Sequence, residues 1–263
     1  MQTKSIDVHN NEIHFNPKAF GQRYTVNGDK KTGVTTIIGA RFGKGALIWW
    51  AENIVYESLL SKFQMEKQPV DFIQQFTDGL KAIVSEKKME AATIGTNLHN
   101  IAEQYMIGKN PTAPVSEPLL TMFNKFTKWW DSSGFKVVAT EKTMYSNELD
   151  VCGTTDLIVT HKKWKGKYGI LDLKTSKDYY PDMPVQLAAY QKLCEDSSTL
   201  KIDYLGIIKV PKEPTKEVDL FMIKPDKEYL DAFKHCQALL KYEASFNKKM
   251  RAYKKQLTEK GNK

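Results

Sequence analysis

The spacing of apolar residues along the chain predicts short strands first, then a helical region, then a region rich in strands. Residues 1–40 predict β-like pieces at Arg23–Val26 and Val34–Ile38, separated by turns of Gly, Asn and Asp. From Ala46 to about Ile107 apolar residues recur every three or four positions, which is typical of helices. The chain therefore changes its structural period near residue 46.

Four helices are predicted between this point and Gly134. They are expected, in chain order, around Leu47–Ser58, Val70–Met89, Thr93–Ile107 and from the capping residue Ser116 to Trp130. Pro69 separates the first from the second, and Gly108 ends the third. The fourth has an apolar stripe that predicts its buried face: Leu119, Met122, Phe123, Phe126 and Trp130.

After Gly134 the pattern favours strands joined by short turns. The predicted elements are strands at Lys136–Lys142, Val151–Thr160 and Tyr168–Lys174, a helix at Met183–Cys194, strands at Tyr204–Val210 and Val218–Ile223, and a long helix from about Pro225. The polar turn His161–Lys167 predicts an antiparallel hairpin. This order indicates an α+β fold, a central mixed sheet flanked by helices.

Charged residues interrupt an apolar strand in the segment Gly-Ile-Leu-Asp-Leu-Lys-Thr. Asp172 and Lys174 are two residues apart, so a strand projects them from one face, and Asp156 on the preceding strand can sit beside them. An isolated Asp-x-Lys is usually an ion pair on an exposed strand, but a buried-type strand needs a reason to hold charges. A bound Mg²⁺ or Mn²⁺ offsets the repulsion, and the lysine would hold or activate a water for in-line attack on a phosphorus.

A second polar pair lies on the predicted third helix. His99 and Glu103 are four residues apart and share a face beside apolar residues. Two readings stay open for His99: a structural histidine, and a neutral imidazole that serves as one more metal ligand.

These residues resemble the RecB-like branch of the PD-(D/E)XK nuclease superfamily. Four short motifs carry the resemblance, in order, over about half of the chain: Gly95-Thr96…His99, Gly153…Asp156, Asp172…Lys174 and Gln186…Tyr190. The N-terminal Gly33-Val-Thr-Thr-Ile-Ile is also similar to phage-type exonucleases and the mitochondrial genome maintenance exonuclease. The resemblance implies a restriction-endonuclease-like core at 93–240, preceded by a β-rich lead-in and helical arch at 1–92. The distribution of charge sets residues 241–263 apart as a basic extension.

The resemblance also implies roles for individual residues. The implied metal ligands are His99, Asp156, Asp172 and the carbonyl of Leu173. Lys174 would be the catalytic lysine, while Gln186 and Tyr190 would position the DNA backbone or a water. Glu141 matches an acidic position ahead of the Gly-x-x-Asp strand, and Glu103 is a further candidate.

The charge and the cysteine content limit which binding partners and cofactors the sequence predicts. The 263 residues carry a net charge of +8, of which +6 lies in residues 241–263 and indicates either a solubilising tail or a DNA contact. Cys152, Cys194 and Cys236 are too few and too scattered for the four-cysteine iron–sulfur cluster of some relatives, so none is expected. With no apolar signal or membrane segment in the sequence, we expect a cytoplasmic protein of bacterial or viral origin.

The expected activity is that of a metal-dependent DNA exonuclease on single-stranded or frayed ends, in recombination, repair or viral DNA processing. Arg41, Lys44, Trp49 and Trp50 would contact phosphates and stacked bases, or the tryptophans would belong to the core. An endonuclease or double-strand exonuclease of the same fold is an alternative, and so is a non-catalytic DNA-binding subunit. A recruiting protein partner is left open.

Overall fold

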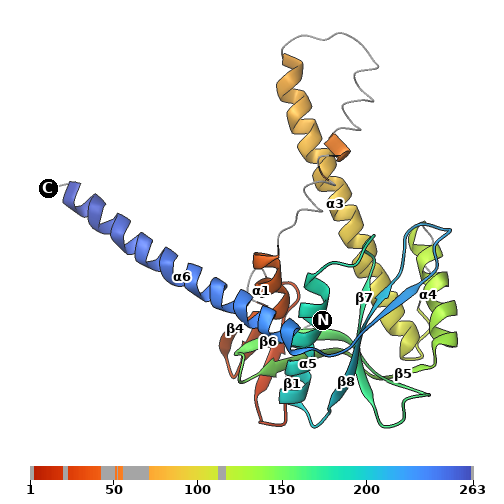
Figure 1. Cartoon of the computed structure of the whole chain (residues 1–263). Helices are drawn as coiled ribbons and strands as arrows, with labels where there is room; N and C mark the ends of the chain where they lie inside the picture. The colour runs from red at the N-terminus through yellow and green to blue at the C-terminus, as the bar shows by residue number, and fades with distance from the viewer. Residues whose placement is uncertain are drawn as a thin grey trace. The chain divides into compact units, whose positions relative to one another are not determined.

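A mixed β-sheet forms the centre of the larger of two compact units (Figure 1). The computed structural model describes residues 3–19, 23–42, 51, 53–55, 71–111 and 117–261. One unit comprises Met1–Phe42 and Asn124–Lys263, and the other comprises Gly43–Phe123. The first 42 residues therefore belong to the same unit as the sheet, and the predicted functional division at residues 93 and 241 stays a prediction.

Nine strands make up the sheet in the described part of the chain. They are β1 (Thr3–Ile6), β2 (Glu12–Phe15), β3 (Tyr24–Val26), β4 (Asp29–Gly33), β5 (Phe135–Ser146), β6 (Val151–His161), β7 (Tyr168–Lys174), β8 (Ile202–Lys209) and β9 (Asp219–Ile223). Their order is β1-β2-β3-β4-β6-β7-β8-β9, and β5 also pairs with β6. The pairs β4/β6 and β7/β8 are parallel and the others antiparallel, which confirms the predicted mixed sheet.

The hairpin that carries the candidate chemistry forms as predicted. Strands β6 and β7 pair antiparallel from Thr160↔Tyr168 to Leu157↔Leu171. Gly166 in the connecting turn has a φ of 74°, a conformation that glycine adopts without steric cost. The hairpin fixes the register that brings Asp156 close to the end of β7.

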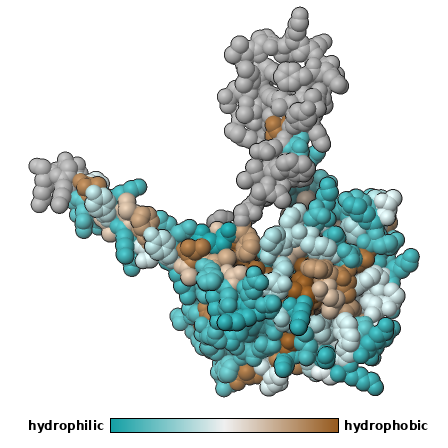
Figure 2. Space-filling view, in the orientation of Figure 1, coloured by the Kyte–Doolittle hydropathy of each residue, from teal (hydrophilic) through white to brown (hydrophobic). Residues whose placement is uncertain are grey.

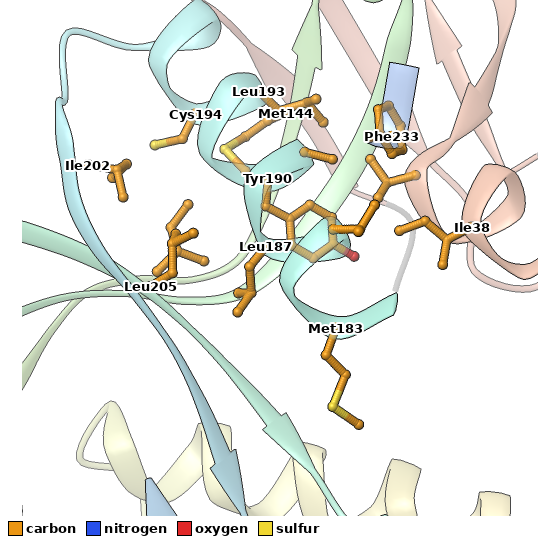
Figure 3. Packing of buried hydrophobic residues seen from close by; sticks show 14 of the residues in the cluster. Ile38, Met144, Met183, Leu187, Tyr190, Leu193, Cys194, Ile202, Leu205 and Phe233 are labelled. Carbon is orange, nitrogen blue, oxygen red and sulfur yellow. The ribbon is translucent and has the colours of Figure 1, made fainter. Parts of the chain in front are cut away.

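The helices in the described residues are α1 (Val34–Arg41), α3 (Asp71–Met106), α4 (Leu119–Ser133), α5 (Asp182–Ser197) and α6 (Lys227–Gly261). One continuous core joins the sheet to α1, α5 and the first turns of α6, as Figure 3 shows with Ile38, Leu187, Tyr190 and Phe233 around the same centre. This layer holds α5 over the sheet strands and so positions its polar residues.

An aromatic cluster packs around Phe135, the first residue of β5. Its ring contacts Trp129 and Trp130 of α4, Tyr204 of β8 and Trp164 of the hairpin turn, with ring centroids 6.2–6.5 Å apart. Trp130 is buried, as are the other four apolar residues predicted for the inner face of α4. Trp129 and Trp130 therefore belong to the packing between α4 and the start of β5.

The predicted strand Val34–Ile38 is wrong, because these residues form helix α1. Its β-branched run, Val-Thr-Thr-Ile-Ile, favours a strand by local propensity. In a helix, however, Val34, Ile37 and Ile38 fall on one face at three- and four-residue spacing, and all three are buried in the core with α5 and α6. Tertiary burial therefore overrides the local preference.

The predicted break between the second and third helices is also wrong. Residues 71–106 form one continuous helix, α3. The interval between the two predictions is Glu90-Ala91-Ala92, which consists of good helix formers and contains no Pro or Gly, so nothing ends the helix there. Gly108, with φ of 76°, follows its C-terminal end as predicted.

Helix α6 continues far beyond the core. Its side chains from Lys241 to Glu259 are exposed except for Met250, and Figure 2 shows brown apolar residues among teal polar ones along it. Neither α6 nor any other helix within the described ranges combines the length and the apolar character that a membrane span needs. The predicted first helix around Leu47–Ser58 lies mostly outside the described residues, and the arch expected around it is not described.

Candidate active site

The buried strand β7 places a carboxylate and a lysine side by side. All residues from Gly169 to Leu173 are buried, as expected for a strand whose neighbours pair with it on both sides. Lys174 Nζ lies 2.5 Å from Asp172 Oδ2, and the Asp172 side chain is only 3% exposed. The two side chains project together, as their spacing predicts.

Asp156 lies where strands β6 and β7 stop pairing. The described register of the two strands ends at Leu157↔Leu171. Beyond it, Asp156 Oδ2 accepts a hydrogen bond from the backbone N–H of Leu173 at 2.9 Å. The side chain thus fills the opening between the strands and brings its carboxylate to the Asp172–Lys174 pair.

The electrostatics of the three groups are coupled through Lys174. Burial by itself lowers the pKa of this lysine, but the negative charges of Asp172 and then Asp156 raise it, and they prevail. Because its pKa stays above the usual value, Lys174 is a cation at neutral pH. It can stabilise negative charge or orient a water, but it cannot serve as a general base in that state.

Helix α5 supplies two polar side chains to the same place. Lys174 Nζ donates to Gln186 Oε1 at 3.3 Å, and Gln186 Nε2 donates to the Tyr190 hydroxyl at 2.9 Å. Burial raises the pKa of Tyr190 well above its usual value, and the nearby Asp172 adds to the effect. Tyr190, 3% exposed and inside the core cluster of Figure 3, therefore stays neutral and holds Gln186 towards the lysine.

Glu141 lies opposite Asp156 on strand β5. Its neighbours pair as Thr140↔Leu157 and Lys142↔Thr155, and one carboxylate oxygen of Glu141 lies within 4.8 Å of one of Asp156. The backbone of Glu141 has a φ of 43°, the left-handed region that costs a non-glycine residue about 1–2 kcal/mol. Such strain is concentrated at functional sites, where another requirement maintains it.

The donor set of Glu141 and Asp156 fits a hard divalent cation. Two oxygens that bind one such ion, each at about 2.0–2.6 Å, lie within roughly 5 Å of each other, as these do. Carboxylate oxygens are also the ligands that Mg²⁺ and Mn²⁺ prefer. The pair could therefore hold a metal ion.

The remaining predicted site residues are placed as follows. His99 and Glu103 lie one turn apart on α3 in the second unit, both half-buried. Arg41 is paired with Glu243 of α6 through its two terminal nitrogens, Nη1 and Nη2, and this pairing raises its pKa. Lys44, Trp49 and Trp50 lie outside the described residues.

The sequence did not indicate a chain of hydroxyl groups beside the carboxylates. The Tyr24 hydroxyl lies 3.2 Å from Thr154 Oγ1, which lies 3.1 Å from Thr143 Oγ1. Tyr24 is 130 residues from Thr154 in the sequence, and only the antiparallel register of β5 and β6 pairs Thr143 with Thr154. No local pattern signals either contact.

Comparison with known proteins gives weak likenesses only. No protein-family model and no curated protein matches the chain. The crystal structure of a "putative exonuclease" from Eubacterium rectale is 15% identical over 56% of this chain and 64% of its own, with a TM-score of 0.37. The crystal structure of SSO0001 is 12% identical over 73% of this chain and 86% of its own, with a TM-score of 0.34. The first match spans less than two thirds of the other protein, and at these scores neither likeness supports an argument about activity.

Proposed function

We propose that the protein is a divalent-metal-dependent deoxyribonuclease that hydrolyses phosphodiester bonds from single-stranded or frayed DNA ends. The observation that carries the proposal is the group of Asp156, Asp172 and Lys174 where β6 and β7 separate, with Glu141 opposite. Asp156 and Asp172 beside the single half-buried Lys174 leave excess negative charge, which a structural ion pair does not require.

Glu141, Asp156 and Asp172 would hold Mg²⁺ or Mn²⁺, with the Leu173 carbonyl as a further ligand. His99 is kept as a proposed nitrogen ligand on its sequence motif alone. When bound, the cation supplies Lewis-acid activation and neutralises charge on the phosphate. The positions of the three carboxylates determine where the cation's positive charge lies in the site.

Lys174 would orient the attacking water and stabilise charge on the phosphoryl oxygens. Gln186 and Tyr190 limit its rotamers through the hydrogen bonds described above. Gln186 and Tyr190 are therefore positioning residues in this proposal. Any contribution of Glu103 also stays a proposal.

The assignment to DNA ends, and to recombination, repair or viral DNA processing, rests on the family resemblance and its arch. The resemblance suggests that Arg41, Lys44, Trp49 and Trp50 guide the strand. In the structure, Arg41 meets a carboxylate of the same chain, so a phosphate would have to displace Glu243 to use it.

The test is a nuclease assay with Mg²⁺ and with Mn²⁺ on end-labelled linear and on circular single-stranded DNA. The wild-type protein should shorten linear strands from an end, and Asp172→Ala and Lys174→Ala should not. The matched control is Asp203→Ala, since Asp203 is exposed and accepts a hydrogen bond from Tyr168 at the opposite end of β7.

Three outcomes would contradict parts of the proposal. Cleavage of circles would show an endonuclease. Activity that survives Asp172→Ala would remove the site assignment. DNA binding without any cleavage in either metal would favour the non-catalytic alternative.

A further inference from the structure

A cavity of about 400 Å³ opens beside the first turn of α1. Two cationic side chains and three hydroxyls line it: Arg23, Lys31, Thr32, Thr35 and Thr36. The ring of Tyr24 forms part of its wall. Every one of these residues belongs to the larger unit, so the cavity is built within a single body.

The cavity lies at the positive end of a helix. Helix α1 begins at Val34 after Gly33, which offers no side-chain cap, and its first turn has no acidic residue. The first backbone N–H groups of a helix have no partners inside the helix, and the helix dipole gives them a partial positive charge. Gly33 also lines the cavity, and a Cβ at this position would approach the Tyr24 ring to 2.9 Å.

The charge in the cavity is positive even after internal pairing. Lys31 Nζ lies 2.8 Å from Asp150 and 5.7 Å from the centre of the Tyr145 ring, so its position is fixed and its charge is partly balanced. Arg23 is exposed and forms no ion pair with another described residue. A guanidinium, three hydroxyls and helix N–H groups are the donors that proteins use for phosphate.

The cavity wall leads directly to the candidate active site. Tyr24 donates to or accepts from Thr154, and Thr154 contacts Thr143. These threonines are two residues from Asp156 and Glu141 on their strands, a span of about 7 Å. The pKa of Tyr24, raised chiefly by burial, is also raised by Glu141 and lowered by Arg23, so the phenol lies within electrostatic reach of both.

The other side of the cavity meets the basic half of α6. Leu240 lines the cavity, and the chain from Lys241 onward carries eight Lys and Arg residues against two acids. The Arg41–Glu243 pair ties α6 to the far end of α1. A polyanion that occupied the cavity would therefore find further cations next to it.

We propose that this cavity binds one phosphate group of a nucleic-acid strand whose neighbouring phosphodiester lies at Asp156 and Asp172. This inference rests on the proposed nuclease function. It adds that Arg23 and the start of α1 determine which phosphodiester bond reaches the carboxylates. The phosphate is either a terminal monoester or an internal diester, because both offer the same oxygens to Arg23 and the helix.

The experiment measures DNA binding by the full chain in EDTA, where no cleavage occurs. The probes are fluorescent oligothymidylates with a phosphate at the 5′ end, at the 3′ end, or at neither. Arg23→Gln should weaken binding about tenfold, as expected for the loss of a charge-assisted bidentate contact. Lys30→Gln is the matched control, since it removes the same charge from an exposed position next to Lys31 that does not line the cavity.

The probes separate the two sources of phosphate. If Arg23→Gln weakens only one phosphorylated oligonucleotide, the cavity holds a terminal monoester at that end. If all three are weakened equally, it holds an internal diester. Thr36→Val, which removes one hydroxyl from an exposed position, should weaken the same probes about threefold, and circular dichroism checks that both variants fold.

The two proposals fail in different ways. Equal binding of all probes by Arg23→Gln, Thr36→Val and Lys30→Gln overturns the phosphate cavity, whatever the nuclease assay gives. Cavity-dependent binding by a wild-type protein that cleaves nothing in Mg²⁺ or Mn²⁺ overturns the nuclease and leaves the cavity supported.

Discussion

Two lysine–aspartate pairs on the same sheet differ in what surrounds them. In the Asp172–Lys174 pair of β7, the side chains are 3% and 25% exposed. In the Lys31–Asp150 pair, which ties β4 to the turn before β6, they are 19% and 55% exposed. The contrast lies in the carboxylates: Asp150 stays more than half exposed to water and also accepts a hydrogen bond from the Tyr145 hydroxyl at 2.8 Å, whereas Asp172 is almost fully buried.

The buried pair has no comparable balance. Moving charges out of water costs several kcal/mol per ion unless close partners compensate, and Asp156 adds a second negative charge beside the one cation. A pair that served stability alone could often be replaced by apolar residues at little loss. The comparison therefore supports the functional role proposed for the buried pair, whereas the exposed carboxylate of Asp150 needs no role beyond holding Lys31.

The largest expected contrast is in activity. Asp172→Asn should lower the rate of DNA cleavage about 10³-fold, which is roughly 4 kcal/mol of transition-state stabilisation, because it removes a charge from the proposed metal and phosphate site. Asp150→Asn should change the rate at saturating DNA less than twofold, since any effect through Lys31 in the cavity would act on DNA binding. Initial rates on end-labelled DNA measure both, and a loss of similar size in the two variants would end the functional distinction.

At the buried pair, a double substitution should lower the free energy of unfolding less than a single substitution. Lys174→Met should lower the free energy of unfolding by about 2–4 kcal/mol, since it leaves Asp172 buried without its cation. Asp172→Leu combined with Lys174→Met should recover most of that loss and remain inactive, because an apolar pair suits this strand. Urea unfolding measures all three, and a double variant less stable than Lys174→Met would show that the pair stabilises the fold.

Glu141 extends the comparison to a carboxylate that is exposed but strained. Glu141→Gly relieves the left-handed backbone and should raise the free energy of unfolding without metal by about 1 kcal/mol. Saturating Mg²⁺ should then stabilise the wild-type protein by about 2–3 kcal/mol and the variant by less. Thermal unfolding with and without Mg²⁺ tests this, and an equal metal response would remove Glu141 from the ligand set.

The sequence predicts the buried pair and misses the strain for a physical reason. An Asp and a Lys two apart in an apolar run reveal themselves by periodicity, and so does the β6/β7 hairpin. Glu141 has its left-handed φ between Thr140 and Lys142, which pair with β6 in one unshifted register. Neither the residue pattern nor the strand pairing signals this conformation.

The cavity beside α1 could not be predicted from the sequence, because Val34–Ile38 were expected to form a strand. Reading Val34–Ile38 as a strand removes the helix start, and with it the N–H groups that make the Thr35–Thr36 segment suited to an anion. The helix is favoured only by its apolar face, where Val34, Ile37 and Ile38 pack in the core with α5. Long-range packing thus determines both the helix and the site that depends on it.

The smallest expected effect concerns the surface pair and its pH dependence. The hydrogen bond from Lys31, and then that from Tyr145, hold the pKa of Asp150 below its usual value. The folded protein therefore binds that proton more weakly than the unfolded chain, and the pair contributes stability above about pH 4 that is lost as the pH falls through the lowered pKa.

The variant Asp150→Asn should cost less than about 1 kcal/mol of the free energy of unfolding at pH 7, because the carboxylate is more than half exposed. Asparagine also tolerates the φ of 52° at this position. The difference between wild type and variant should shrink towards zero near pH 2–3, and 1 M salt should reduce it at pH 7. Urea unfolding at the two pH values measures it, and a cost above 2 kcal/mol that persists in acid would mean that this pair, too, is held for more than its charge.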